Sequence, residues 1–159
     1  IDFINYPQRI FPIGRLDKDS EGLILLTNDG SIVNKILDNQ NQHEKDYLVT
    51  VNKKLTPSFL EGMRGGVNIY NPVRNEYVVT NKSRVKQVDN KTFKITLTQG
   101  YNRQIRRMCT KLGYQVTRLK RIRIMNIELG KLPIGKWREL EKKEVTELLK
   151  LIQEEKENE

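Results

Sequence analysis

The chain has 159 residues, which is enough for one domain with a hydrophobic core. Lysine and arginine number 29 against 20 aspartate and glutamate residues, so the formal net charge is +9 and the isoelectric point is near 9.7. This balance favours an anionic partner such as a nucleic acid. No apolar run approaches the roughly 20 residues of a membrane helix. The single cysteine cannot form an internal disulfide, so we expect a cytoplasmic protein with no membrane partner.

The first informative segment is residues 14–30, which reads GRLDKDSEGLILLTNDG. Its polar turn places Asp17 ahead of an apolar run and a second turn. A carboxylate held on a loop between ordered segments is suited to chemistry, although aspartate in a turn also commonly bonds the nearby backbone. We expect the neighbouring Asp19 and Glu21 to be solvated turn residues, and Asp17 is the carboxylate at which chemistry could take place.

A short helix is predicted at residues 31–38, and a strand begins at Tyr47. Lys45 and Tyr47 are two residues apart, so an extended chain points both side chains to one face. A cation and an aromatic ring on one face suit a phosphate and a base, although such a pair is also common in ordinary strands. The only histidine, His43, has no second metal ligand at ligand spacing, and we expect it to be an exposed loop residue.

The middle of the chain has the signals of a scaffold. Thr56 followed by Pro57 predicts a helix through Met63, which the glycines at 65 and 66 would end. Short alternating segments then predict strands at residues 67–69, 77–80, 83–88 and 93–98. Strands interspersed with helices and hairpins indicate an α+β fold with a mixed, largely antiparallel sheet and flanking helices.

A second polar cluster reads QGYNRQIRRMC over residues 99–109. It predicts a helix that runs to Leu112, with Asn102 as its N-cap and Gly113 as its stop. The first two turns carry three arginines: Arg103, Arg106 and Arg107. The helix dipole disfavours cations there, which indicates an anion to be bound, and the alternative is that the arginines only solvate a surface helix. Cys109 falls on the apolar side of this helix and is expected to be buried.

The strand that follows is rich in cations. Strict alternation would place Arg121 and Arg123 on one face with Leu119, and Arg118 and Lys120 on the other. A basic groove there would attract RNA phosphates, whereas a merely solvated basic strand is the alternative.

The C-terminal part completes one predicted domain. Further strands are predicted at residues 122–129 and 137–140, and a closing helix at residues 141–153. The domain therefore spans residues 1–153, and a charged, frayed tail follows at residues 154–159.

Four motifs in this order resemble those of the RsuA-type pseudouridine synthase family. The aspartate, tyrosine and arginine motifs of that family are matched, in chain order, by residues 14–30, 45–47 and 102–108. Residues 113–121 resemble the strand that follows the arginine motif, and residues 123–126 and 133–138 resemble the family's large-subunit branch. The similarity extends from Arg9 to about Leu151.

The chain departs from this family in two respects. Members usually carry a small N-terminal RNA-binding module and a first catalytic strand with an Asn-Lys-Pro-like motif. This chain begins just before the aspartate motif, so we expect a catalytic-domain fragment. Tyr101 stands where many members have arginine, which puts one phosphate contact in doubt.

The resemblance implies a pseudouridine synthase fold with a central active-site cleft across the sheet. It implies an enzyme that isomerises a specific uridine of RNA, in large-subunit ribosomal RNA or in a transfer-RNA stem-loop of similar shape. Asp17 would attack a flipped-out nucleotide, Arg106 would keep that carboxylate ionised, and Tyr47 would stack on the uracil. The expected RNA-binding residues are Arg15, Lys45, Arg103, Arg107, Leu119 and Arg121, with Leu119 as the apolar floor of the base pocket.

The isomerisation involves no redox change or phosphate transfer, so we expect no metal and no small-molecule cofactor. The sequence has no cysteine–histidine ligand set and no dinucleotide fingerprint. Two other functions remain open. A non-catalytic basic RNA-binding module would be supported equally by the charge alone. A glycosidase usually needs two facing carboxylates, and the candidates Asp19 and Glu21 lie only in the same turn as Asp17.

Overall fold

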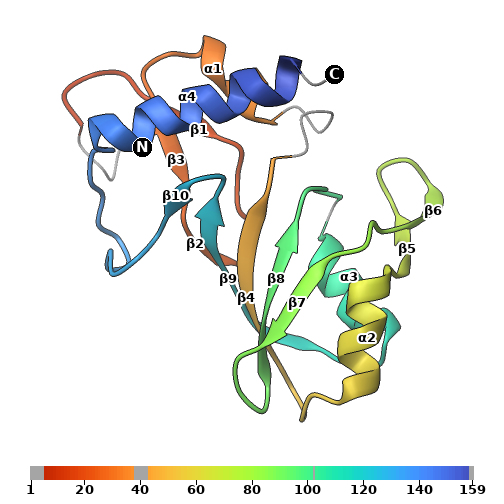
Figure 1. Ribbon diagram of the computed structural model, residues 1–159. Coiled ribbons are helices and arrows are strands. Elements are labelled where there is room, and N and C mark those ends of the chain that lie inside the picture. The colour runs from red at the N-terminus through yellow and green to blue at the C-terminus, as the bar shows by residue number, and fades with distance from the viewer. Residues whose placement is uncertain (1–5, 38–42, 102, 158–159) are drawn as a thin grey trace.

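The computed structural model describes residues 6–37, 43–101 and 103–157, with side chains described as far as residue 152. Its centre is a six-stranded sheet in the order β10–β9–β4–β8–β7, with β2 beside β9 (Figure 1). The pair of β2 and β9 is parallel and the other pairs are antiparallel, which confirms the predicted mixed, largely antiparallel sheet. The strands are β2 (Glu21–Gly22), β4 (Lys45–Val51), β7 (Arg84–Gln87), β8 (Thr92–Leu97), β9 (Val116–Ile124) and β10 (Ile127–Glu128).

Two groups of elements flank this sheet (Figure 1). One group is α1 (Ser31–Leu37), α4 (Lys142–Glu157) and the two-stranded sheet of β1 (Phe11–Ile13) and β3 (Leu25–Thr27). The other group is α2 (Pro57–Gly65), α3 (Gln104–Lys111) and the hairpin of β5 (Asn68–Asn71) and β6 (Glu76–Val79). The flanking helices that the sequence predicts are therefore present.

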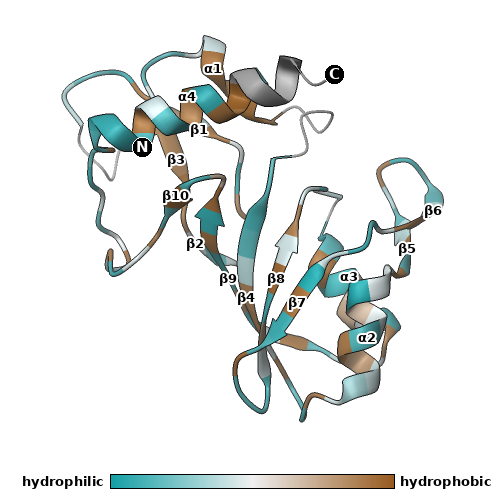
Figure 2. Ribbon diagram, in the orientation of Figure 1, coloured by the Kyte–Doolittle hydropathy of each residue, from teal (hydrophilic) through white to brown (hydrophobic). Residues whose placement is uncertain are grey.

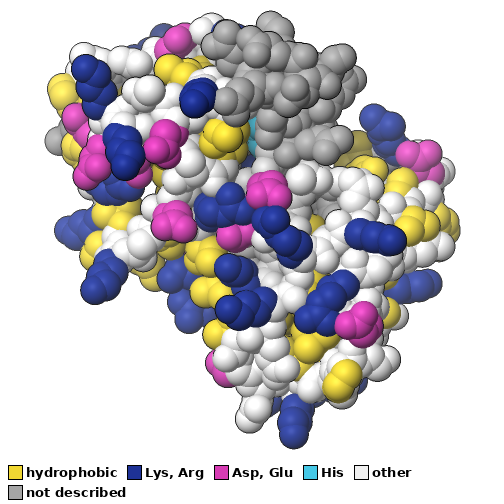
Figure 3. All heavy atoms as spheres, viewed as in Figure 1, with side chains coloured by type: hydrophobic (Ala, Val, Ile, Leu, Met, Phe, Trp, Pro, Cys, Tyr) yellow, Lys and Arg dark blue, Asp and Glu magenta, His cyan; other side chains and the backbone are white. Residues whose placement is uncertain are grey.

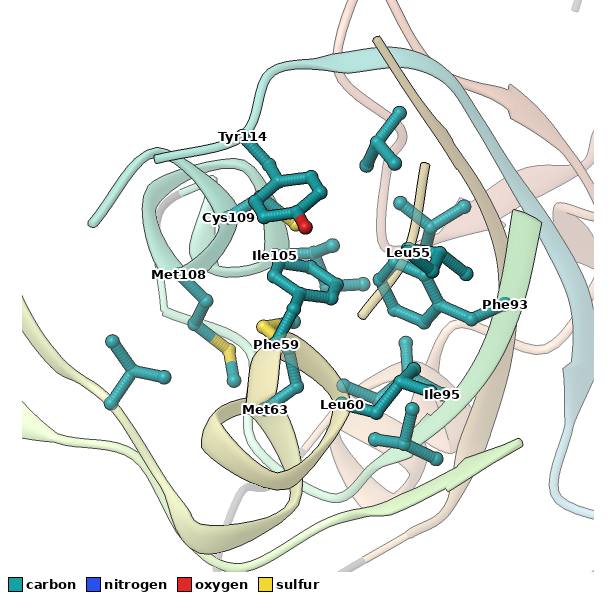
Figure 4. Packing of buried hydrophobic residues seen from close by; sticks show 14 of the residues in the cluster. Leu55, Phe59, Leu60, Met63, Phe93, Ile95, Ile105, Met108, Cys109 and Tyr114 are labelled. Carbon is teal, nitrogen blue, oxygen red and sulfur yellow. The ribbon is translucent and has the colours of Figure 1, made fainter. Parts of the chain in front are cut away.

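Each group packs its own hydrophobic cluster. The first cluster belongs to the group of α2 and α3. In it, Phe59 of α2 lies between Tyr114, at 4.1 Å between ring centroids, and Phe93 of β8, at 5.5 Å (Figure 4). The second cluster joins Ile36 of α1 to Leu148 of α4 and to apolar residues of β1, β3 and β10. Figure 2 colours β3 and parts of α4 as hydrophobic, in agreement with this packing.

Most of the predicted elements are found near their predicted bounds. The helix signal at Thr56 is confirmed, because its hydroxyl accepts a hydrogen bond of 3.1 Å from the Phe59 N–H. The strand predicted at residues 122–129 is interrupted by a turn at Met125 and Asn126, where Met125 has a φ of 54°. No strand forms at residues 137–140, and α4 continues to Glu157 instead of ending at residue 153.

One register shift corrects the predicted faces of β9. Asp46 is opposite Arg123, whereas Tyr47, the next residue, is opposite Arg121. The extra residue on β9 reverses the alternation, as a β-bulge does. Arg123 therefore leaves the face of Arg121 and Leu119, and its guanidinium forms a fork with Asp46 at 2.7 and 2.9 Å.

Arg123 shares its sheet face with three lysines, Lys86 of β7, Lys94 of β8 and Lys120 of β9. They stand in one row across the sheet, in which Leu48 of β4 separates Lys94 from Lys120. In Figure 3, Lys and Arg side chains gather over the region where Figure 1 draws β4, β7 and β8.

His43 is a second correction, because it is buried rather than exposed. Its Nδ1 lies 2.8 Å from the carbonyl oxygen of Ile36, near the end of α1. Short-range sequence reasoning cannot find this contact, since it depends on tertiary packing of His43 against α1. Across the described residues, the helices are too short or too polar to cross a membrane.

Candidate active site

The Asp17 loop connects β1 to β2 and is closed by a local turn. The Ser20 N–H donates a hydrogen bond of 2.9 Å to the Asp17 carbonyl. The Asp17 side chain is 35 % exposed. Among the described residues, its carboxylate accepts no hydrogen bond, so both oxygens remain open to a reacting group.

Gly22 fixes the end of this loop against the central sheet. Its φ is +112°, and a Cβ there would lie only 2.2 Å from the Arg121 carbonyl oxygen. The next residue, Leu23, donates its N–H to that same carbonyl at 2.8 Å. Only glycine permits this backbone approach, so Gly22 sets the distance between the Asp17 loop and β9.

The start of α3 faces the loop in an unusual conformation. Arg103 occupies the N-cap position with a φ of 49° and makes no side-chain cap, while the predicted cap, Asn102, lies outside the described residues. The buried Gln104 side chain instead accepts a hydrogen bond of 3.2 Å from the Tyr101 N–H. The spacing of Tyr101 and Gln104 resembles a capping box and is the signal that could have identified Gln104.

Arg103 joins the two motifs through charge. Its guanidinium forms a fork with both Asp19 oxygens, at 2.9 and 2.7 Å, and lies 3.7 Å from an Asp17 oxygen. The hydrogen bonds from Arg103 lower the pKa of Asp19 to about 2. Asp19 is therefore a paired carboxylate and not the purely solvated turn residue that the sequence predicts.

Arg106 holds the same loop by its backbone. One Nη atom donates to the Asp19 carbonyl at 2.7 Å and lies 3.4 Å from the Ser20 hydroxyl, and the other is 3.5 Å from an Asp19 oxygen. The expected direct pair between Asp17 and Arg106 does not form among the described residues, because Arg103 stands beside Asp17 instead. Arg106 is only 14 % exposed, and its buried Nε has no hydrogen-bond partner in the described part of the chain.

The inner face of the sheet gathers the tyrosine motif and the basic strand. Gly22, Arg121 and Tyr47 stand in one row across β2, β9 and β4. Strands lie about 4.8 Å apart, so Tyr47 is about 10 Å from the end of the Asp17 loop. Tyr47 is half-buried against the first hydrophobic cluster, to which Leu119 also belongs. The register thus supports the predicted neighbourhood of Tyr47, Leu119 and Arg121.

Two cations face each other on this inner surface. Burial, together with the positive charge of Arg121, lowers the pKa of Lys45. Arg121 is itself buried; its Nε donates to the Leu23 carbonyl at 2.8 Å, and one Nη has no partner among the described residues. Arg121 is therefore an interior cation and not part of an open basic groove. Two close cations, one with a spare donor, favour an anion between them.

The remaining predicted RNA contacts are more exposed. Arg15 is exposed on the Asp17 loop, and Arg107 is partly exposed on α3.

Asp46, inside the tyrosine motif, has a structural role that sequence reasoning missed. Burial opposes its ionisation, but hydrogen bonds from Arg123 and Thr96 outweigh that effect and lower the pKa of Asp46.

A cavity of about 960 Å³ adjoins the loop at Leu16 and is lined largely by apolar side chains from β3, α4 and residues 132–140. The cavity lining does not include Asp17, Tyr47 or Arg106, so the candidate site is separate from it. Within the described residues, no group of three or more His, Cys, Asp or Glu side chains is arranged to hold a metal ion.

The family model described as RNA pseudouridylate synthase matches residues 2–111, which include Asp17, Tyr47, Arg103, Arg106 and Arg107. The chain belongs to the RNA pseudouridylate synthase family. Its fold agrees: a solved pseudouridylate synthase superposes with a TM-score of 0.83 at 30% identity, over 92% of this chain and 64% of that chain.

Relatives in this family share much of the sequence. The dual-specificity RNA pseudouridine synthase RluF of Salmonella typhi is 55% identical over 153 residues, which are 96% of this chain and 51% of that protein. The ribosomal large subunit pseudouridine synthase B of Bacillus subtilis is 35% identical over 92% of this chain and 60% of that protein. The chain thus spans about half the length of the RluF proteins it matches.

Proposed function

We propose that this chain catalyses the isomerisation of uridine to pseudouridine in RNA, with Asp17 as the nucleophile. One observation carries the proposal. Arg103 and Arg106, from the helix of the second motif, hold the loop of the first motif by its Asp19 carboxylate and its backbone, and leave the Asp17 oxygens open. Family membership supports the reaction class.

The proposed reaction is an isomerisation, so uridine and pseudouridine have the same composition. The Asp17 carboxylate attacks the anomeric carbon C1′, and the bond from C1′ to N1 of uracil breaks. The base rotates, C5 forms a bond to C1′ as the aspartyl bond breaks, C5 gives up its proton, and N1 gains one. A flipped-out base is required, because C1′ cannot be reached inside a stacked duplex.

The surrounding side chains supply charge and position. Arg103 places a positive charge 3.7 Å from one oxygen of the attacking carboxylate. Arg106 positions the loop through the Asp19 carbonyl and Ser20. Tyr47 offers a ring for stacking and a hydroxyl for proton movement near the sugar, and the spare Arg121 donor together with Lys45 would receive a phosphate or a uracil oxygen.

The substrate proposed is large-subunit ribosomal RNA, with a transfer-RNA stem-loop as a second target. The relatives support this choice, since one is named for dual RNA specificity and another for the large ribosomal subunit. The net charge of +9 suits a polyanion. The proposal places the reaction in the cytoplasm, where an unpaired, buried Cys109 stays reduced.

A glycosidase is less well supported by the site. That chemistry needs a second carboxylate that can act as an acid. Asp19 is the nearest carboxylate along the chain, but Arg103 occupies both of its oxygens and its pKa is about 2, so it does not hold a proton at neutral pH.

The test is conversion of transcribed large-subunit ribosomal RNA labelled with tritium at C5 of uridine, because forming pseudouridine releases that hydrogen. We expect Asp17→Asn to lose conversion while retaining RNA affinity. Asp29→Asn is the matched control, since it removes the same charge from a neighbouring turn and keeps an oxygen to accept the Ser31 N–H. Near-parent conversion by Asp17→Asn would exclude Asp17 as the nucleophile. RNA binding without any conversion by the parent chain would favour the non-catalytic module.

A further inference from the structure

A groove of about 450 Å³ lies between α3 and the β5–β6 hairpin, next to the candidate active site. Arg106 belongs to both, because it lines the groove and also holds the Asp17 loop. The groove has the size of a small-ligand site. Its walls are of two kinds, aromatic on the hairpin and cationic on the helix, and its described lining includes no acidic side chain.

The aromatic wall is a pair of tyrosines held by strand pairing. Tyr70 of β5 is opposite Tyr77 of β6, with ring centroids 5.3 Å apart. The strand alternation turns Ile69 inward and both tyrosines outward, so that Tyr77 is 69 % exposed. The Tyr70 hydroxyl bonds the Asn75 side chain, which fixes that ring. A preformed, exposed aromatic pair offers flat faces at little ordering cost.

The cationic wall comes from one face of α3. Arg107, Thr110 and Lys111 are spaced three and four residues apart, so they share a helix face, and all three line the groove. Two positive side chains and a hydroxyl opposite two aromatic rings match the chemistry of a nucleotide, in which an anionic phosphate adjoins a planar base.

We propose that this groove binds an unpaired nucleotide of the RNA substrate, adjacent in the strand to the target uridine. Its base stacks on Tyr77 and its phosphate lies between Arg107 and Lys111. The inference rests on the proposed function, because Arg106 makes the groove continuous with the Asp17 loop.

Such a subsite has a consequence for the reaction. Extruding a base from a stem-loop costs stacking energy, and a neighbouring nucleotide that stacks on protein offsets part of that cost. The groove would therefore strengthen RNA binding and favour substrates with an unpaired nucleotide beside the target, with little dependence on which base it carries, since every base presents a flat face.

The test compares Tyr77→Ala with Tyr77→Phe, which keeps the ring. A hairpin of transcribed ribosomal RNA with an unpaired nucleotide beside its target uridine serves as the probe. We expect Tyr77→Ala to weaken binding roughly 5- to 150-fold and Tyr77→Phe to bind like the parent. Lys111→Gln should reduce the slope of log affinity against log salt by about one. Val73→Ala is the control, because Val73 is exposed on the same hairpin but does not line the groove.

Equal binding by the parent and Tyr77→Ala, with both folded by circular dichroism, would overturn the inference. So would an equal loss in Tyr77→Ala and Tyr77→Phe, because the flat ring would then not be the feature that binds. Tritium release by the parent reports on the proposed function separately. If the parent converts RNA and Tyr77→Ala binds RNA as tightly as the parent, the proposed function is retained and only the subsite is refuted.

Discussion

Gly22→Ala gives the sharpest test of how the Asp17 loop is positioned. A side chain at a φ of +112° costs about 1–3 kcal/mol, because L-residues rarely adopt that conformation. The new Cβ would also lie 2.2 Å from the oxygen and 2.6 Å from the nitrogen of Arg121. Relief of that clash would move β2 away from β9 and lose the hydrogen bond from Leu23, worth about 1 kcal/mol.

We therefore expect Gly22→Ala to lower the free energy of unfolding by about 2–4 kcal/mol, which corresponds to a fall in Tm of roughly 4–16 °C. Thermal unfolding followed by circular dichroism measures this change. Below the melting temperature, conversion of RNA should remain impaired, because the displaced loop carries Asp17.

Two glycines provide matched controls. Gly66→Ala meets a similar clash, with its Cβ 2.4 Å from the Thr80 oxygen at a φ of +94°, but the atoms it meets belong to Val79 and Thr80 and not to β9. It should destabilise the fold similarly and still convert saturating RNA. Gly30→Ala has no neighbour within 4 Å and should behave like the parent. If Gly22→Ala has the same Tm as Gly30→Ala, the close approach of Gly22 to the β9 backbone does not constrain the fold as argued.

The other predictions concern single side chains. Arg106→Lys keeps the charge but loses the planar guanidinium, in which one Nη atom bonds the Asp19 carbonyl and Ser20 and the other lies 3.5 Å from the Asp19 carboxylate. Single-turnover conversion should therefore slow strongly with little change in RNA affinity, and a parent-like rate would refute the positioning role. The pKa of Asp19 is lowered from 3.8 to about 2, so its pairing with Arg103 stabilises the fold above pH 4, and this stabilisation is lost as the pH falls toward 2. Between pH 5 and pH 3, the free energy of unfolding measured in urea should therefore decrease less in Asp19→Asn than in the parent. Burial raises the pKa of Cys109 to about 12, so the native thiol should resist iodoacetamide at pH 8 and react fully in urea; rapid native labelling would contradict this.

Local signals predicted most of the scaffold because they act over a few residues. Thr56 caps α2 as expected, and α3 ends two residues before Gly113, which has the positive φ of a helix stop. The apolar positions of β8 alternate and are buried on one face, including Phe93 and Ile95. The strand predicted at residues 137–140 is wrong because local signals do not show what a segment packs against. Trp137 and its apolar neighbours line a cavity instead of pairing with a strand.

Partners at long range were less predictable. The motifs indicated that the arginine helix and the aspartate loop meet, but the sequence did not show which arginine lies beside Asp17. Arg103 and Arg106 differ by three positions on one helix face, and the left-handed backbone at Arg103 redirects its side chain toward Asp17 and Asp19. The bulge in β9 likewise moved Arg123 to the other sheet face, which no alternation pattern shows.

The sequence by itself determined the family, the α+β class and the residues that carry charge, because these depend on composition, local periodicity and the order of short motifs. Only the tertiary structure decided which cation faces Asp17, that Arg121 is buried, and that Gly22 fits against β9. Those facts depend on register and backbone approach between segments about 100 residues apart, where a shift of one residue turns a side chain to the opposite face.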